Sequence, residues 1–301
     1  MLRALTLITP TALLLGLLIT TGCTVVNQSR TVSPQMSHIL LAEPEPVNIR
    51  SQLWLNRLTN ILLKSVEIPD VQRAEVLYQR GLLYDAVGLW GLAKSDFDAA
   101  IQLKPDMAEA FNFLGIHYTQ NQQFIQAYDA FDSTLDIEPQ HEYAYLNRGI
   151  ALHYGGRAEL AVSDFEVFHK NDTADPFRAI WLFIAERDVD LVAAKTRLAK
   201  LRNGLDNERW EMNLVRFYLG EISESELKDR LMFNIKSNLQ LTQRLCEAYF
   251  YLGKYHTAQG RMSEASNYFK LSLSTNVYQY VEHRYARLEL ELMRERTVES
   301  D

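Results

Sequence analysis

The sequence predicts an all-α protein in which helical hairpins stack into a superhelix with flanking N- and C-terminal helices. Three observations lead to this fold class. Small and aromatic residues recur every 34 positions, apolar residues outside these columns fall on one face of a helix, and no stretch of useful length alternates apolar and polar residues as a strand does. The 301 residues suffice for one or two domains.

The repeat is visible in five columns that share one period. The columns are occupied by Gly81, Gly115 and Gly149; by Ala93, Ala127 and Ala161; by Phe97, Phe131 and Phe165; by Pro105 and Pro139; and by Tyr84, Tyr118 and Leu152. A period of 34 with these residue types is typical of the tetratricopeptide repeat (TPR), whose unit is a pair of antiparallel helices. A later unit places Gly253 and Ala265 in the same frame.

The glycine column has a steric explanation. Glycine inside a helix costs about 1 kcal/mol relative to alanine, so its recurrence indicates that something larger does not fit. We expect Gly81 and Ala93 to lie where the two helices of one unit cross most closely, with aromatic side chains filling the space beside the crossing. The proline column ends the second helix of each unit, because proline lacks the donor that a helix needs.

The first residues predict a secretory signal peptide over residues 1–22. Arg3 precedes an uncharged run from Ala4 to Ile19, and small residues lead to Cys23. This order of charge, apolar stretch and small residues is typical of a signal, and the run is shorter than the roughly 20 residues that span a membrane. We expect Cys23 to be lipidated, since several acyl chains hold a protein firmly at a membrane. An ordinary cleaved signal with an incidental cysteine is the alternative.

Two segments precede the repeats. Residues 23–46 are polar and proline-containing, so we predict a flexible tether after the lipidated cysteine. Residues 47–73 are predicted to contain a helix, because Leu53, Trp54 and Leu58 lie on one apolar stripe. This helix either covers the flank of the first repeat or meets the same helix of a second copy.

The remaining chain is expected to be helical throughout. In chain order we predict three TPR repeats, degenerate helical pairs, one further TPR repeat, and a capping helix with a tail, at 74–175, 176–245, 246–279 and 280–301. Ser223 and Glu226 form a capping box that starts one of the degenerate helices. The last helix covers the apolar flank that a terminal repeat would otherwise expose.

No motif for catalysis or metal binding is present. The seven histidines are scattered, and the chain lacks HExxH, CxxC, P-loop and GxSxG patterns. The formal net charge of −7 argues against nucleic acid, which requires a basic stripe. We therefore expect no catalytic residue, no metal and no cofactor, and a protein that is not an enzyme. Cys246 lies in an apolar pattern and is expected to be a core residue.

Function is expected on the concave face, which the first helices of the units line. The residues that the repeat frame places there are Tyr78, Asn112, Ile116, Tyr143, Asn147, Ile150 and His153. Because no lysine or arginine accompanies Asn112 and Asn147, a clamp for a peptide carboxylate is not expected in this groove. The mixture suits an extended or helical segment with apolar anchors. Alternatively, the same side chains only pack against their neighbours.

Several strings beyond the generic TPR positions resemble the NlpI family of Gram-negative outer-membrane lipoproteins. They are Tyr84 to Leu89 (YDAVGL), Pro105 to Gly115 (PDMAEAFNFLG), Arg148 to Arg157 (RGIALHYGGR), Asp175 to Glu186 (DPFRAIWLFIAE), Tyr251 to Tyr255 (YLGKY) and Val281 to Ala286 (VEHRYA). The similarity runs from about residue 50 to residue 292, and it departs from the usual lipoprotein signal at Thr20, where leucine is common.

The resemblance implies a homodimer that is anchored through Cys23 in the outer membrane and faces the periplasm. It implies an adaptor that presents a peptidoglycan endopeptidase to a C-terminal-processing protease. It also implies a scaffold for other cell-wall hydrolases and synthases, with effects on wall growth and cell division. Neither partner is assigned to particular residues.

Two other functions remain open at this point. The repeats fit a TPR lipoprotein of another envelope assembly machine, for pilus or outer-membrane protein biogenesis, equally well. A cell-wall hydrolase with a carboxylate pair is a third hypothesis, because the degenerate region carries Asp188, Asp190, Glu208, Glu211 and Glu224. Helical surfaces carry such acids routinely, so the enzyme is the weakest of the three.

Overall fold

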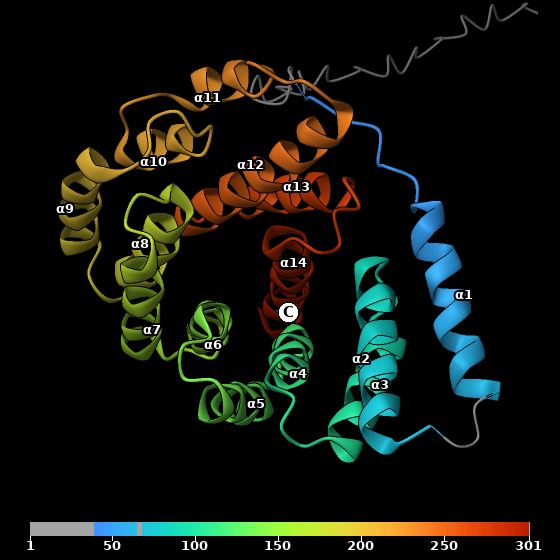
Figure 1. The fold of residues 1–301 in the computed structure, drawn as a ribbon. Coiled ribbons are helices and arrows are strands. Elements are labelled where there is room, and N and C mark those ends of the chain that lie inside the picture. The colour runs from blue at the N-terminus through green and yellow to red at the C-terminus, as the bar shows by residue number, and fades with distance from the viewer. Residues whose placement is uncertain (1–38, 65–67, 301) are drawn as a thin grey trace, which may run out of the picture. The chain divides into compact units, whose positions relative to one another are not determined.

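The computed structural model describes residues 39–64 and 68–300, and over these residues it consists of helices and connecting segments without a strand (Figure 1). The all-α prediction is therefore confirmed. Residues from Leu40 onward form one unit, and the following description concerns that unit. The predicted signal peptide and the lipid site Cys23 lie outside the described residues.

The helices follow one another with short connections. They are α1 (Ile49–Lys64), α2 (Asp70–Ala86), α3 (Trp90–Leu103), α4 (Ala108–Gln120), α5 (Phe124–Ile137), α6 (Glu142–Tyr154), α7 (Ala158–Asn171), α8 (Pro176–Val189), α9 (Leu191–Leu201), α10 (Met212–Leu219), α11 (Glu224–Arg230), α12 (Asn238–Ala258), α13 (Met262–Leu273) and α14 (Val281–Ser300). A short 3-10 turn, Arg202–Gly204, follows α9.

Four hairpins carry the repeat columns, and each packs most extensively within itself: α2 with α3, α4 with α5, α6 with α7, and α12 with α13. In every one, the glycine of the first helix faces the phenylalanine of the second. A Cβ atom on Gly115 would lie 2.5 Å from Cε1 of Phe131, and one on Gly81 would lie 2.7 Å from Cε1 of Phe97. The glycine thus admits an aromatic ring at the crossing, beside a fully buried alanine of the same second helix.

Side-chain caps mark the starts of several helices in the degenerate region. Asp175 caps α8, where Pro176 occupies the first turn, and Asp190 accepts hydrogen bonds from the first amides of α9. The capping box predicted from Ser223 and Glu226 forms at the start of α11 and is confirmed. These caps satisfy amide groups that a helix leaves unpaired at its N-terminus.

Two of the expected segments differ in the structure, the start of the repeats and the predicted tether. Helix α1 ends at Lys64 and α2 begins at Asp70, four residues before the expected start of the repeats, because Pro69 occupies the N-cap position. Residues 40–45 of the predicted tether are bound to α12. The Leu40 amide donates to the Tyr249 hydroxyl at 3.1 Å, and Asn238 donates to the Glu43 carbonyl at 2.7 Å.

Cys246 lies in α12 and is fully buried. Burial raises the pKa of its thiol to about 12, so it stays protonated at neutral pH. Since the thiolate is the reactive form of cysteine, the structure places Cys246 as a small apolar core residue.

Candidate functional site

Helix α14 lies against the concave side of the repeats as well as against the last hairpin. It contacts α12 and α13, as a capping helix should, but it also contacts α4 of the second repeat (Figure 1). The Tyr285 ring of α14 is fully buried and stacks on Tyr154 of α6, with ring centroids 5.5 Å apart. The last helix is therefore more than the predicted cap, because it fills much of the expected groove.

A buried ion pair joins α14 to the first repeat. Arg284 donates through Nη1 to Oδ1 of Asp85 at 2.9 Å, and its Nη2 bonds to the second oxygen of the same carboxylate. Nε2 of His117 lies 3.3 Å from that carboxylate. Burial by itself raises the pKa of Asp85, but hydrogen bonds from His117 and Arg284 outweigh it and lower this pKa to about 2. Asp85 is therefore ionised at neutral pH and holds α14 to α2.

A second buried ion pair joins α14 to α12. The Lys254 ammonium lies 2.6 Å from Oε1 of Glu289, and both side chains are only 4% exposed. The Tyr154 hydroxyl donates to the same carboxylate at 2.9 Å. Nε2 of His153 lies 3.1 Å from Nζ of Lys254, and Nδ1 of His153 lies 3.2 Å from Asp188. Burial lowers the pKa of His153, so its imidazole is neutral at pH 7.

Two hollows of the groove remain open beside α14. One of about 500 Å³ is lined by Asn112, Ile116, Tyr143 and Asn147, which are four of the seven predicted groove residues. The other, of about 420 Å³, is lined by His153. We name the first the concave hollow.

The other two predicted groove residues line neither of these hollows. Ile150 is fully buried in the core, and Tyr78 packs its ring against Phe97, with centroids 6.0 Å apart. Tyr78 is partly buried, whereas the Ile150 side chain has no exposed surface. For Ile150 the expectation of a groove contact was therefore wrong, because its side chain packs wholly inside the core.

The concave hollow mixes apolar, amide and charged groups. Tyr143 lines the hollow and is 53% exposed. Asn147 donates to the side-chain carbonyl of Asn112 at 3.0 Å. Nε2 of His141 lies 3.2 Å from Oε1 of Glu109. The hydrogen bond with Glu109 raises the pKa of His141. An extended peptide segment could place an apolar side chain on Tyr143 and amide groups on the polar atoms.

Among the residues of this hollow that sequence reasoning missed are His141 and Arg284. His141 caps α6 by accepting the Ala144 amide, and a polar side chain two residues after Pro139 is a signal that could have located it. No local signal locates Arg284, because its position depends on where α14 crosses the repeats.

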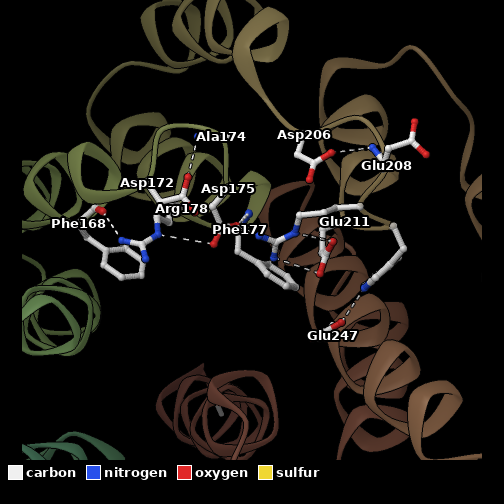
Figure 2. A network of polar contacts seen from close by, with 12 residues as sticks. Phe168, Asp172, Ala174, Asp175, Phe177, Arg178, Asp206, Glu208, Glu211 and Glu247 are labelled. Atoms are coloured by element: carbon white, nitrogen blue, oxygen red, sulfur yellow. Dashed lines mark hydrogen bonds and ion pairs between the residues drawn. The ribbon is translucent and has the colours of Figure 1, made fainter.

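A polar network fixes the segment between α9 and α10 (Figure 2). Arg209 lies 3.4 Å from Asp175 at the start of α8 and 3.2 Å from Glu211. The Trp210 indole donates to Glu247 of α12 at 3.0 Å. These contacts attach the segment between α9 and α10 to the start of α8 and to α12.

Three of the five acids considered for a hydrolase pair contact a basic side chain, and Asp190 caps α9. Asp188 lies 3.2 Å from His153, Glu211 lies 3.2 Å from Arg209, and Glu224 lies 2.6 Å from Lys228. Within residues 39–64 and 68–300, no group of three or more histidine, cysteine or acidic side chains is placed to hold a metal ion. None of the helices in the described part of the chain has the length and hydropathy to cross a bilayer.

Two buried carboxyl groups belong to the packed pair α12 and α14, Glu247 of α12 and Glu282 in the first turn of α14. Burial raises the pKa of Glu282 to about 7. Burial also raises the pKa of Glu247, and the Glu282 and Glu211 carboxylates raise it further. Glu282 accepts a hydrogen bond from the Tyr251 hydroxyl at 2.9 Å. The folded protein therefore favours the protonated form of Glu282.

This burial predicts a stability that depends on pH. The contribution of Glu282 is fully present below its unfolded pKa of about 4.5 and is lost as pH rises through about 7. Glu282→Gln, which stays neutral and keeps an acceptor for Tyr251, should raise the free energy of unfolding by roughly 1–3 kcal/mol at pH 8 and by much less at pH 5. Urea unfolding at both pH values measures the difference. Glu159→Gln, at an exposed carboxyl on α7, serves as the control; an equal effect at pH 5 and pH 8 would contradict the prediction.

The chain matches no family model. Among solved structures, a tetratricopeptide repeat protein from Parabacteroides merdae aligns with a TM-score of 0.51 at 15% identity, covering 82% of this chain and 96% of that chain. PilF from Pseudomonas aeruginosa aligns with a TM-score of 0.42 at 16% identity over 73% of this chain and 99% of that chain. A structure titled MamA MSR-1 aligns with a TM-score of 0.42 at 18% identity over 52% of this chain and 97% of that chain.

The first of these similarities concerns the fold alone, and the scores of the other two are too low to support an inference. The first similarity agrees with the 34-residue columns and with the four glycine-to-phenylalanine contacts. The chain accordingly has the all-α fold of a tetratricopeptide-repeat superhelix.

Proposed function

We propose that this protein is a scaffold that binds other proteins in the concave hollow. The observation that carries the proposal is the hollow itself. It opens beside α14 in a TPR superhelix, and it offers the exposed Tyr143 ring next to the Asn112 and Asn147 amides. A large aromatic anchor beside polar groups is the composition of binding hot spots.

We further propose that the partners are cell-wall enzymes. The chain would act as an NlpI-like adaptor that presents a peptidoglycan endopeptidase to a C-terminal-processing protease and that binds wall hydrolases and synthases. The strings that resemble the NlpI family support this proposal. One of them, Val281 to Ala286, supplies both Arg284 and Tyr285, which hold α14 in the groove. The resemblance thus includes contacts that shape the concave hollow.

The same proposal includes an outer-membrane anchor at Cys23 and a homodimer. Helix α1 supports the dimer, because it exposes the apolar side chains of Ile49, Leu53, Trp54 and Leu63 to solvent. An apolar patch of this kind on a monomer marks an interaction surface. A second copy of α1 would cover it.

Co-purification tests the scaffold role. The chain, when it is purified from a membrane extract, should retain a wall endopeptidase and a C-terminal-processing protease. Tyr143→Ala should reduce the recovery of at least one of them about ten-fold or more, because it removes the exposed ring of the hollow. Leu160→Ala, at an equally exposed apolar position on α7, should leave recovery unchanged. Recovery of neither enzyme by the parent chain would reject the adaptor role. Equal losses of recovery in both variants would show that the binding site is not the concave hollow.

A further inference from the structure

Another hollow, in the degenerate region, lies far along the chain from the concave hollow, and it is rich in arginine. It measures about 630 Å³ and is formed by residues 207–216, by residues 230–234 and by the first turns of α12. Arg216, Arg230 and Arg244 line it, together with the rings of Trp210 and Phe233. We name it the arginine hollow.

The three guanidinium groups of this hollow bind neutral oxygens. Arg216 donates to the side-chain carbonyl of Asn207 at 3.3 Å, and Arg230 donates to that of Asn213 at 3.0 Å. Arg244 donates to two backbone carbonyls, at 3.2 and 2.7 Å. None of these three arginines forms an ion pair with a carboxylate of the described residues.

Arg209, in contrast, lines the same hollow but is fully engaged. It contacts the carboxylates of Glu211 and Asp175 at 3.2 and 3.4 Å. The chain carries a formal net charge of −7, so three cations without a carboxylate partner in one hollow form a local exception. Their charge complements that of an anionic ligand.

Arg244 is the most deeply placed of the three. It is only 6% exposed, and its Nε atom has no hydrogen-bond partner. A buried charged group with an unused donor is costly unless an acceptor compensates for it. Burial accordingly lowers the pKa of Arg244, although the Glu211 and Glu247 carboxylates act in the opposite direction. An anion in the hollow would supply the missing acceptor.

The remaining lining residues restrict the kind of anion. Glu208 and Glu211 also line the hollow, and their charge disfavours a doubly charged group such as phosphate. A singly charged, planar carboxylate fits the fork of a guanidinium group. The Arg244 guanidinium lies 5.5 Å from the centre of the Trp210 ring, and the Phe233 ring is 77% exposed.

Because a guanidinium group and an aromatic ring lie close together in the arginine hollow, we expect a ligand that carries a carboxylate next to an apolar group. The end of a peptide chain is such a ligand. The last residue of a peptide carries its carboxylate and its side chain on the same carbon atom, so both groups reach adjacent sites together. We propose that the arginine hollow binds the C-terminal carboxylate of a peptide whose last side chain is apolar. The carboxylate accepts from Nε of Arg244 and contacts Arg216 and Arg230, and Trp210 and Phe233 receive the side chain. This site is separate from the concave hollow, so its failure would leave the proposed scaffold role untouched.

A pair of peptide probes tests the proposal on the full chain. The first probe is a fluorescein-labelled hexapeptide that ends in phenylalanine with a free carboxylate, and the second is the same peptide with a C-terminal amide. Fluorescence anisotropy should show binding of the acid and at least ten-fold weaker binding of the amide. Equal affinities, or no binding of the acid, would overturn the proposal without any variant being required.

Two further probes distinguish other anions. An amidated hexapeptide with one internal glutamate should bind as weakly as the simple amide; tight binding would assign the hollow to acidic side chains instead. Inorganic phosphate should displace the acid peptide only at concentrations far above the peptide affinity. Displacement by phosphate at the peptide's own concentration would show a simple anion site and would refute peptide recognition.

Variants locate the binding. Arg216→Gln and Arg230→Gln should each weaken binding of the acid peptide about ten-fold and leave the weak binding of the amide unchanged. Arg202→Gln is the matched control, because Arg202 pairs with Glu221 at 2.7 Å and does not line the hollow. A loss in Arg202→Gln equal to the loss in the other two would show a general charge effect and reject the site.

Discussion

Gly115→Leu is expected to lower the free energy of unfolding by about 3 kcal/mol or more, because overpacking a core commonly costs 1–3 kcal/mol and here the obstacle is rigid. A Cβ atom at this position would lie 2.5 Å from Cε1 and 2.7 Å from Cζ of Phe131. Phe131 is fully buried in the core, so its ring has no open space to enter. The two helices of the hairpin, α4 and α5, would have to separate. Denaturant unfolding followed by circular dichroism measures the loss.

Gly91 offers a control for this substitution. It also lies inside a helix, α3, but nothing lies within 4 Å of the position that its Cβ would take. Gly91→Ala should leave stability unchanged or raise it by up to about 1 kcal/mol, because alanine favours the helix. If Gly115→Leu unfolded at the same denaturant concentration as the parent, the steric explanation of the glycine column would be wrong.

Lys254→Met is expected to destabilise the protein by about 3–5 kcal/mol, because it leaves a buried carboxylate without its partner. Burial alone raises the pKa of Glu289, but the Lys254 ammonium 2.6 Å away outweighs it and keeps the pKa of Glu289 low. Without the ammonium, Glu289 must either remain charged in the core or take up a proton. The loss should therefore shrink as pH falls, which unfolding at pH 5 and pH 8 would show.

A double substitution separates the ion pair from packing. Lys254→Met together with Glu289→Met should regain most of the lost stability, since apolar replacement of a buried pair is often neutral or stabilising. Lys94→Met is the exposed counterpart, because Lys94 and Asp98 are about one third exposed and lie 2.7 Å apart. It should cost no more than about 1 kcal/mol. Equal losses of stability for Lys254→Met and Lys94→Met would mean that the Lys254–Glu289 ion pair is accessible to solvent.

The sequence by itself determined the repeat architecture. The 34-residue columns place Gly81, Gly115, Gly149 and Gly253 opposite phenylalanine rings, because each hairpin buries its crossing through contacts between residues only 16 positions apart. Local signals also determined helix starts, as at Ser223. The repeat frame brought Asn112, Tyr143 and their neighbours to one hollow, since first helices of successive units stack on one face.

Only the tertiary structure decided what the groove contains. Asp85 meets Arg284 across 199 positions, and His153 meets Lys254 across 101 positions. Local spacing does not encode such pairs, because the rotation from one hairpin to the next accumulates along the superhelix and sets where its far end returns. That accumulated curvature places α14 on α4 and leaves the concave hollow open beside Tyr143.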